Sequence, residues 1–116
     1  MKKQGGDPIA FFWEIAERFL LEADIVEGTV MGFPCLRLNG GFLACAQHRS
    51  GDLIVKLPEK RVQELIDCGQ GQAFAPAGRK FKQWVQVGGR SARRWRLLIK
   101  AARDFSRAAD ISISSR

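Results

Sequence analysis

Apolar residues near the start of the chain recur at intervals of three and four, which is the period of one face of an α-helix. They are Phe12, Ile15, Ala16, Phe19 and Ala23. Asp7-Pro8 comes before them, and this pair suits a first helical turn, because Asp can accept a bond from a free amide and Pro has no N–H to leave unpaired. The pattern predicts a first helix from residue 8 to about residue 22.

The following part of the chain has the texture of extended segments separated by turns. Asn39-Gly40 tolerates the positive φ angles of a tight hairpin, and Arg49 to Asp52 has the composition of a second turn. We therefore expect a meander of three strands at residues 31–38, 41–48 and 53–57.

A second helix and two more strands are predicted from the middle of the chain. Pro58-Glu59 begins the helix and Gly69 suits the left-handed residue that commonly ends one. Extended pieces at residues 72–75 and 82–87 flank the turn Pro76-Ala77-Gly78 and are expected to extend the sheet.

Ser91 is a candidate cap for a final helix with a long apolar stripe. The stripe consists of Trp95, Leu98, Ile99, Ala102, Phe105 and Ala109. The predicted order is α-β-β-β-α-β-β-α, which is an α+β fold with one antiparallel sheet covered by helices. The 116 residues fit a single domain, 1–116, with an ordered core from about residue 7 to about residue 110.

Positive charge is concentrated at one end of the chain. Residues 1–78 carry eight basic and ten acidic side chains, a balance of −2, whereas residues 79–116 carry eleven and two, a balance of +9, which together give the net charge of +7. Basic clusters of this kind attract polyanions.

The basic residues of the last helix fall on one face, roughly opposite the apolar stripe. Like charges three and four residues apart weaken a helix by a few tenths of a kcal/mol per pair, so helix stability does not explain them. Together with the basic residues before the helix they predict a surface that contacts DNA or RNA through backbone phosphates. The predicted nucleic-acid-binding residues are Arg79, Lys80, Lys82, Arg90, Arg93, Arg96, Lys100, Arg103 and Arg107. The alternative is that these residues form only a solvated charged face. Trp84, beside the basic residues, is a candidate for stacking on a base, and the alternative for it is a position in the core.

No catalytic, metal-binding or cofactor-binding motif is recognisable. His48 is the single histidine, and no partner stands at a motif distance from it. Cys35, Cys45 and Cys68 lack a Cys-x-x-Cys pair and predict neither a disulfide framework nor a zinc site. We expect a nonenzymatic protein with no metal and no cofactor. The apolar segment at the start is interrupted by charges, which excludes a signal peptide or membrane span there and favours a cytoplasmic location.

Five short segments share their order and texture with one known family. They are Val30-Met31-Gly32-Phe33-Pro34, Gly40-Gly41-Phe42-Leu43-Ala44, Leu53-Ile54-Val55-Lys56-Leu57, Gly78-Arg79-Lys80 and Trp84-Val85-Gln86-Val87. On these segments the chain resembles the bacterial TfoX N-terminal-like and YjbR (MmcQ)-like group of small proteins, over roughly residues 9–109. It departs from the family at Gly32-Phe33-Pro34, where a glycine pair is expected.

The resemblance implies an α-β(3)-α-β(2)-α fold, similar in layout to secretion chaperones, in a bacterial cytoplasmic protein. Better-known members of the group are linked to competence regulation and are often described as DNA-binding, and no enzyme activity is attached to them. The leading interpretation is a nonenzymatic DNA- or RNA-binding or regulatory module. The alternative is a protein-interaction or chaperone-like module, with a protein partner or as a homodimer, in which the sheet or the first helix with Phe11 and Trp13 presents an apolar surface.

Overall fold

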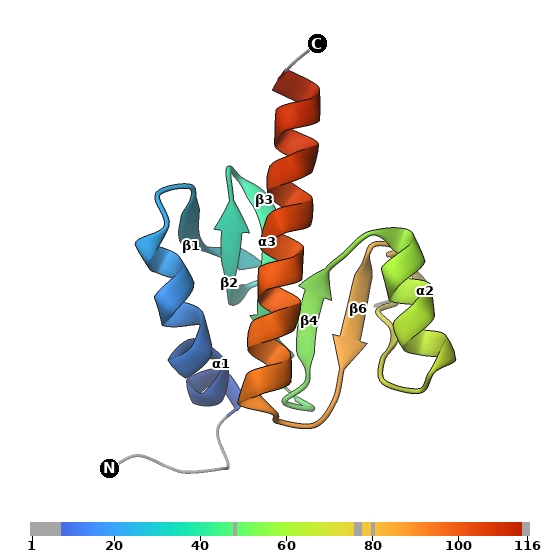
Figure 1. Cartoon of the computed structure of the whole chain (residues 1–116). Helices are drawn as coiled ribbons and strands as arrows, with labels where there is room; N and C mark the ends of the chain where they lie inside the picture. The colour runs from blue at the N-terminus through green and yellow to red at the C-terminus, as the bar shows by residue number, and fades with distance from the viewer. Residues whose placement is uncertain (1–7, 48, 76–77, 80, 115–116) are drawn as a thin grey trace.

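The computed structural model describes residues 8–47, 49–75, 78–79 and 81–114. A six-stranded antiparallel sheet forms its centre, with the spatial order β1-β2-β3-β4-β6-β5 (Figure 1). The strands are β1 (Ile25–Val30), β2 (Phe33–Leu38), β3 (Gly41–Ala46), β4 (Leu53–Lys56), β5 (Gln72–Ala73) and β6 (Trp84–Val87). The helices are α1 (Pro8–Ala16), the 3-10 helix η1 (Glu17–Leu21), α2 (Glu59–Asp67) and α3 (Ala92–Ser114). The predicted α+β class with an antiparallel sheet is confirmed.

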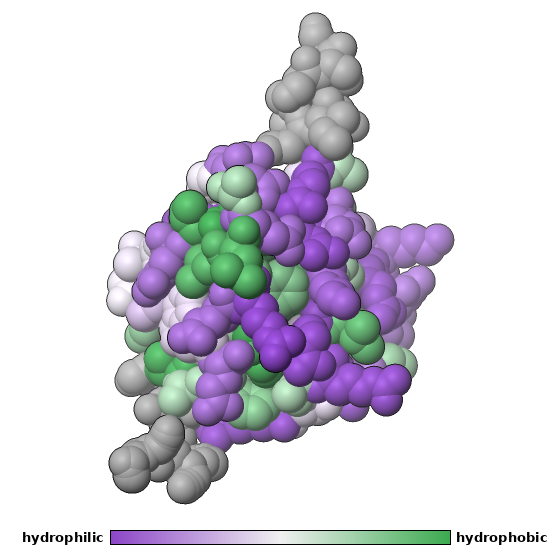
Figure 2. Space-filling view, turned by 60° about the vertical axis from the view of Figure 1, so that its left-hand side comes forward, coloured by the Kyte–Doolittle hydropathy of each residue, from purple (hydrophilic) through white to green (hydrophobic). Residues whose placement is uncertain are grey.

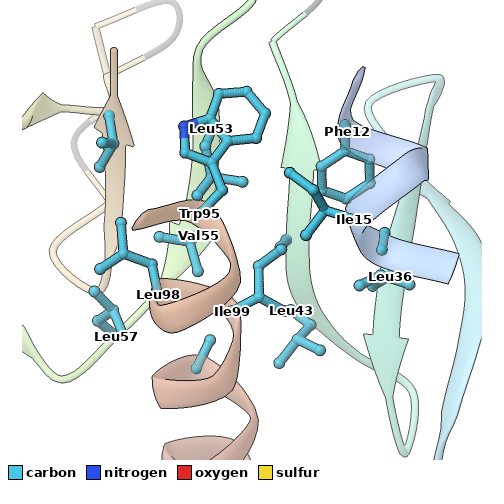
Figure 3. Packing of buried hydrophobic residues seen from close by; sticks show 14 of the residues in the cluster. Phe12, Ile15, Leu36, Leu43, Leu53, Val55, Leu57, Trp95, Leu98 and Ile99 are labelled. Atoms are coloured by element: carbon cyan, nitrogen blue, oxygen red, sulfur yellow. The ribbon is translucent and has the colours of Figure 1, made fainter. Parts of the chain in front are cut away.

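Helices α1 and α3 lie side by side against one face of the sheet, and α2 lies beside β6 (Figure 1). The main core fills the space between these helices and the sheet, where Phe12, Leu43 and Ile99 are fully buried (Figure 3). Trp95 of α3 is also fully buried, and its indole N–H donates a 2.8 Å hydrogen bond to the carbonyl of Gly89. No helix within the described ranges has both the length and the apolar character needed to cross a membrane.

Strand β1 was not predicted from the sequence, and β2 begins two residues later than expected. Gly28 lies in the middle of β1 and obscures its strand pattern, but a Cβ at this position would lie 2.7 Å from Cδ of Arg37. A side chain at this position would displace Arg37, which donates hydrogen bonds to the carbonyls of Thr29 and Gly40. The turn between β1 and β2 is formed by Met31 and Gly32, with φ angles of 51° and 82°. A methionine is an uncommon residue in this left-handed region, which is why the turn escaped prediction.

The predicted hairpin turn at Asn39-Gly40, the helix end at Gly69 and the cap at Ser91 are confirmed, whereas Asp7, the predicted cap of the first helix, lies outside the described residues. Asn39 and Gly40 have φ angles of 49° and 88°, as a two-residue hairpin requires. Gly69, with φ of 82°, follows the end of α2 and donates its N–H to the carbonyl of Ile66. The hydroxyl of Ser91 accepts the N–H of Arg94 at 3.2 Å and caps α3.

The two long helices differ from prediction in their bounds. The first is α-helical only to Ala16 and continues to Leu21 as a tighter 3-10 helix, and the last continues to Ser114 instead of ending near residue 110. The predicted turn at Pro76-Ala77 and the residue His48 lie outside the described residues.

A second, smaller cluster occupies the opposite face of the sheet. Because side chains alternate along a strand, Cys45 and Ile54 point away from the face that holds Ala44 and Val55. The cluster consists of Cys35, Phe42, Cys45, Ile54 and Phe74, with Val30, Phe81 and Trp84 packed against it. None of these residues belongs to a helix. We call this side of the sheet the open face.

Candidate nucleic-acid interface

The predicted phosphate-binding residues are divided between the two sides of the sheet. The guanidinium carbon of Arg79 lies 5.7 Å from the ring centre of Phe81, which belongs to the cluster on the open face. Lys82 is exposed and borders the same region. The remaining predicted residues lie on α3 or, for Arg90, just before it, whereas Lys80 lies outside the described residues. The structure does not bring Arg79 and Lys82 together with the α3 residues.

The carboxyl-terminal half of the α3 stripe is paired with carboxylates from the amino-terminal part of the chain. Arg107 binds Asp24 through two nitrogens, with Nε 2.9 Å from Oδ2 and Nη2 2.8 Å from Oδ1. The same Nη2 lies 2.8 Å from Oε1 of Glu22, and Nη1 of Arg103 lies 2.8 Å from Oε2 of Glu22. We call Glu22, Asp24, Arg103 and Arg107 the ion-pair cluster.

The ion-pair cluster holds the charged form of each member. Hydrogen bonds from Arg107 are the main reason that the pKa values of Glu22 and Asp24 lie below their ordinary range. In turn, Asp24 raises the pKa of Arg107, and Glu22 raises the pKa of Arg103. These two arginines therefore join α3 to the segment between η1 and β1, and their charges are already balanced by neighbouring carboxylates.

The amino-terminal half of the stripe has a different environment. Arg93, Arg96 and Lys100 form no ion pair with any described residue. Arg96 and Lys100 face Arg18 of η1 across a groove of about 210 Å³ between η1 and α3. Figure 2 shows this side of the molecule, where hydrophilic side chains cover much of the surface around a smaller apolar patch.

This cationic groove has an apolar floor and positively charged walls. Ile15 and Phe19 form the floor, and the Arg103–Glu22 pair closes one end. Its lining thus carries four cations and a single carboxylate. The arrangement suits an anionic group that carries several oxygen acceptors.

Arg18 is the member of the groove that the sequence did not reveal. It lies on the helical segment next to the buried Phe19, and in the sequence it reads as an ordinary charge on the solvent side of a helix. Only the packing of η1 beside α3 brings Arg18 to Arg96 and Lys100.

Trp84 is half-buried and packs among three other aromatic rings. Its ring lies 4.1 Å from that of Phe42 in β3 and 5.5 Å from that of Phe74 after β5, and these strands lie on opposite sides of β6 in the sheet. Phe81 adds a third ring at 4.7 Å. Trp84 thus lies between the two alternatives, packed against the smaller cluster but not fully buried.

Other chemically active groups are scattered. No group of three His, Cys, Asp or Glu side chains within the described residues is placed to hold a metal ion. Cys35 and Cys45 are cross-strand partners and both are buried free thiols, whereas Cys68 is exposed. Burial raises the pKa of the Cys45 thiol to about 12. This thiol is therefore protonated and a poor nucleophile at neutral pH.

The fold and the groove define a small α+β protein with a cationic surface on two adjacent helical segments. No protein-family model, no curated protein and no solved structure matches the chain.

Proposed function

We propose that this chain is a nonenzymatic module that binds the phosphate backbone of DNA or RNA in the cationic groove. The observation that carries the proposal is that Arg18, Arg96 and Lys100, from two helical segments, line one groove and have no carboxylate partner among the described residues. Arg93, one turn before Arg96 on the same face, extends this surface toward the start of α3. The proposal assigns phosphate contact and no reading of base sequence, because base edges are read by side chains that enter a groove of the nucleic acid.

The proposal revises which of the predicted residues take part. Arg103 and Arg107 serve the ion-pair cluster, so their replacement acts on stability first. Arg79 and Lys82 lie on the other side of the sheet and fall outside this interface. The interface is therefore smaller than the sequence predicted, and we expect weak, salt-sensitive binding.

The test is a fluorescence anisotropy titration of a labelled duplex and a labelled single strand at several salt concentrations. Replacing Arg96→Glu together with Lys100→Glu is expected to lower affinity by at least about tenfold near 0.1 M salt. It is also expected to reduce the slope of log K against log[salt] by about 2, since each lost phosphate contact removes close to one unit.

A matched control is available on α2. Lys60→Glu with Arg61→Glu makes the same change in net charge on an exposed helix away from the groove. If the control lowers affinity as much as the groove variant, binding depends on net charge alone and the groove is not the site. If the wild-type protein binds neither the duplex nor the single strand at about 50 mM salt, the proposed function is rejected.

We also propose that the chain belongs to the TfoX N-terminal-like and YjbR-like group. The order of the helices and the antiparallel sheet support this assignment. The additional strand β1 distinguishes the structure from the implied α-β(3)-α-β(2)-α layout.

A further inference from the structure

A pocket on the open face has a different character from the cationic groove. It encloses about 160 Å³ at the end of the sheet where the β1–β2 hairpin lies near the end of β3. The residues around it belong to β1, β2, β3, β4 and β6 or to segments next to the strands, β5 included. They are Val30, Met31, Phe33, Cys45, Ala46, Gln47, Ile54, Phe74 and Trp84.

The lining of this pocket favours an aromatic guest. Five of the lining side chains are aromatic or carry sulfur, and such groups make favourable edge and sulfur contacts with an aromatic ring. A dry, apolar cavity of about 150 Å³ is known to accept benzene, so a volume of 160 Å³ accommodates one ring. Met31 and Phe33 at the mouth are 54% and 39% exposed, and a bound ring would cover part of this apolar surface.

Gln47 lines the pocket, and its side-chain oxygen is already occupied by hydrogen bonds. Its Oε1 accepts the backbone N–H groups of Arg49 at 2.7 Å and of Ser50 at 3.1 Å, and these donors fix which end of the amide is the oxygen. The turn holds the residue further, since the N–H of Gln47 donates to the carbonyl of Asp52 at 2.7 Å. The NH2 group is therefore the polar group that Gln47 can offer to a ligand. Such a donor selects a ligand with an acceptor atom.

We propose that this pocket binds a small molecule made of one aromatic ring and a hydrogen-bond acceptor, such as a carbonyl, held by the side-chain NH2 of Gln47. The site is noncovalent, because the buried Cys45 thiol in its wall stays protonated. It lies on the opposite side of the sheet from the cationic groove, so the two sites are independent, and loss of one leaves the other intact.

The test uses two probes of similar size, acetophenone and α-methylstyrene, in which the carbonyl oxygen of the first is replaced by a CH2 group in the second. Titration is followed by 1H–15N NMR of the full chain, with the backbone amides of Cys45 and Ile54 and the indole N–H of Trp84 as reporters. Both probes are expected to shift these signals in the wild-type protein.

The variant Gln47→Glu separates the hydrogen bond from the pocket. It keeps an oxygen for the N–H groups of Arg49 and Ser50 but replaces the NH2 donor with a second acceptor. We expect it to lower the affinity for acetophenone about fivefold or more, while the affinity for α-methylstyrene changes by less than about twofold. Equal effects on the two probes would overturn the assigned role of Gln47.

A second pair of variants tests the location. Val30→Phe places a ring in the pocket and is expected to abolish the binding of both probes, whereas Val26→Phe, on the same strand and outside the lining, leaves it unchanged. If neither probe shifts the reporters at its solubility limit, or if Val30→Phe leaves binding intact, the site is rejected. A dimer in light scattering that Met31→Asp dissociates would assign the pocket to a second copy of the chain and would also overturn the proposal.

Discussion

The two halves of the basic stripe on α3 share one sequence pattern but have different surroundings. In the amino-terminal half, Arg93, Arg96 and Lys100 have no carboxylate partner within the described residues. In the carboxyl-terminal half, Arg103 and Arg107 are bound to Glu22 and to a second carboxylate. A run of cations with helical spacing is therefore not a single functional unit. One half stabilises the fold and the other presents unbalanced charge to solvent.

Charge reversal in the paired half should have the largest effect on stability. Arg103→Glu with Arg107→Glu places two carboxylates beside Glu22 and Asp24, so attraction becomes repulsion. We expect the Tm to fall by roughly 5 °C or more for a domain of this size, measured by circular dichroism at low salt. The matched variant Arg93→Glu with Arg96→Glu makes the same change in charge and should not lower the Tm by more than about 2 °C. If the two variants lose equal stability, the division of the stripe is wrong.

Acid should weaken the fold through the ion-pair cluster. The pKa values of Glu22 and Asp24 are lowered in the folded protein from ordinary values of 4.5 and 3.8, so the unfolded chain binds more protons in acid. Their contribution to the free energy of unfolding is complete above the pKa values of the unfolded chain. It is lost as the pH falls through the lower pKa values of the folded protein. We expect Glu22→Gln with Asp24→Asn to lower the free energy of unfolding by up to about 1 kcal/mol at pH 7.

Urea denaturation at pH 7, 5, 4 and 3 checks this sign. The wild-type protein and the Glu22→Gln, Asp24→Asn variant should differ in unfolding free energy at pH 7 and converge as the pH falls below 4. A Glu14→Gln, Glu27→Gln variant, at two exposed positions that form no ion pair with a described residue, serves as the control and should differ little from wild type at any pH. A constant difference between wild type and the first variant down to pH 3 would contradict the assignment.

The comparison also shows which parts of the site the sequence could predict. The inward face of α3 was predicted correctly from Trp95 to Ala102, because helical period is a local property, whereas Phe105 is half-buried and Ala109 is exposed. The partners of Arg107 were not predictable in this way, since the contact with Glu22 spans 85 residues of chain. Periodicity contains no information on which distant carboxylate will reach a given arginine.

The sheet illustrates the same limit. The hairpin at Asn39-Gly40 was predicted because its residues suit the backbone angles that the turn needs. Strand β1 was missed because Gly28 interrupts its pattern. The space above Gly28 is occupied by Arg37 of the neighbouring strand, a contact that the local sequence does not reveal. The pocket on the open face was missed because Cys45 and Ile54 follow the same apolar runs as the main core, and only alternation in the folded sheet separates them.

The smallest predicted effect tests whether the amino-terminal half of the α3 stripe lowers the free energy of unfolding. Arg93 lies in the first turn of α3, two residues after the Ser91 cap, where positive charge opposes the helix dipole. We expect Arg93→Glu to raise the unfolding free energy by about 0.3–1 kcal/mol at low salt, and the gain should vanish near 1 M salt because exposed charges are then screened. Arg93→Gln should give about half the gain. In the anisotropy titration Arg93→Glu should bind duplex DNA severalfold more weakly than the wild type. A gain in stability together with a loss of binding would show that this arginine stabilises contact with phosphate at the expense of its helix, whereas a loss of stability in both variants would mean that Arg93 supports the fold as Arg103 and Arg107 do.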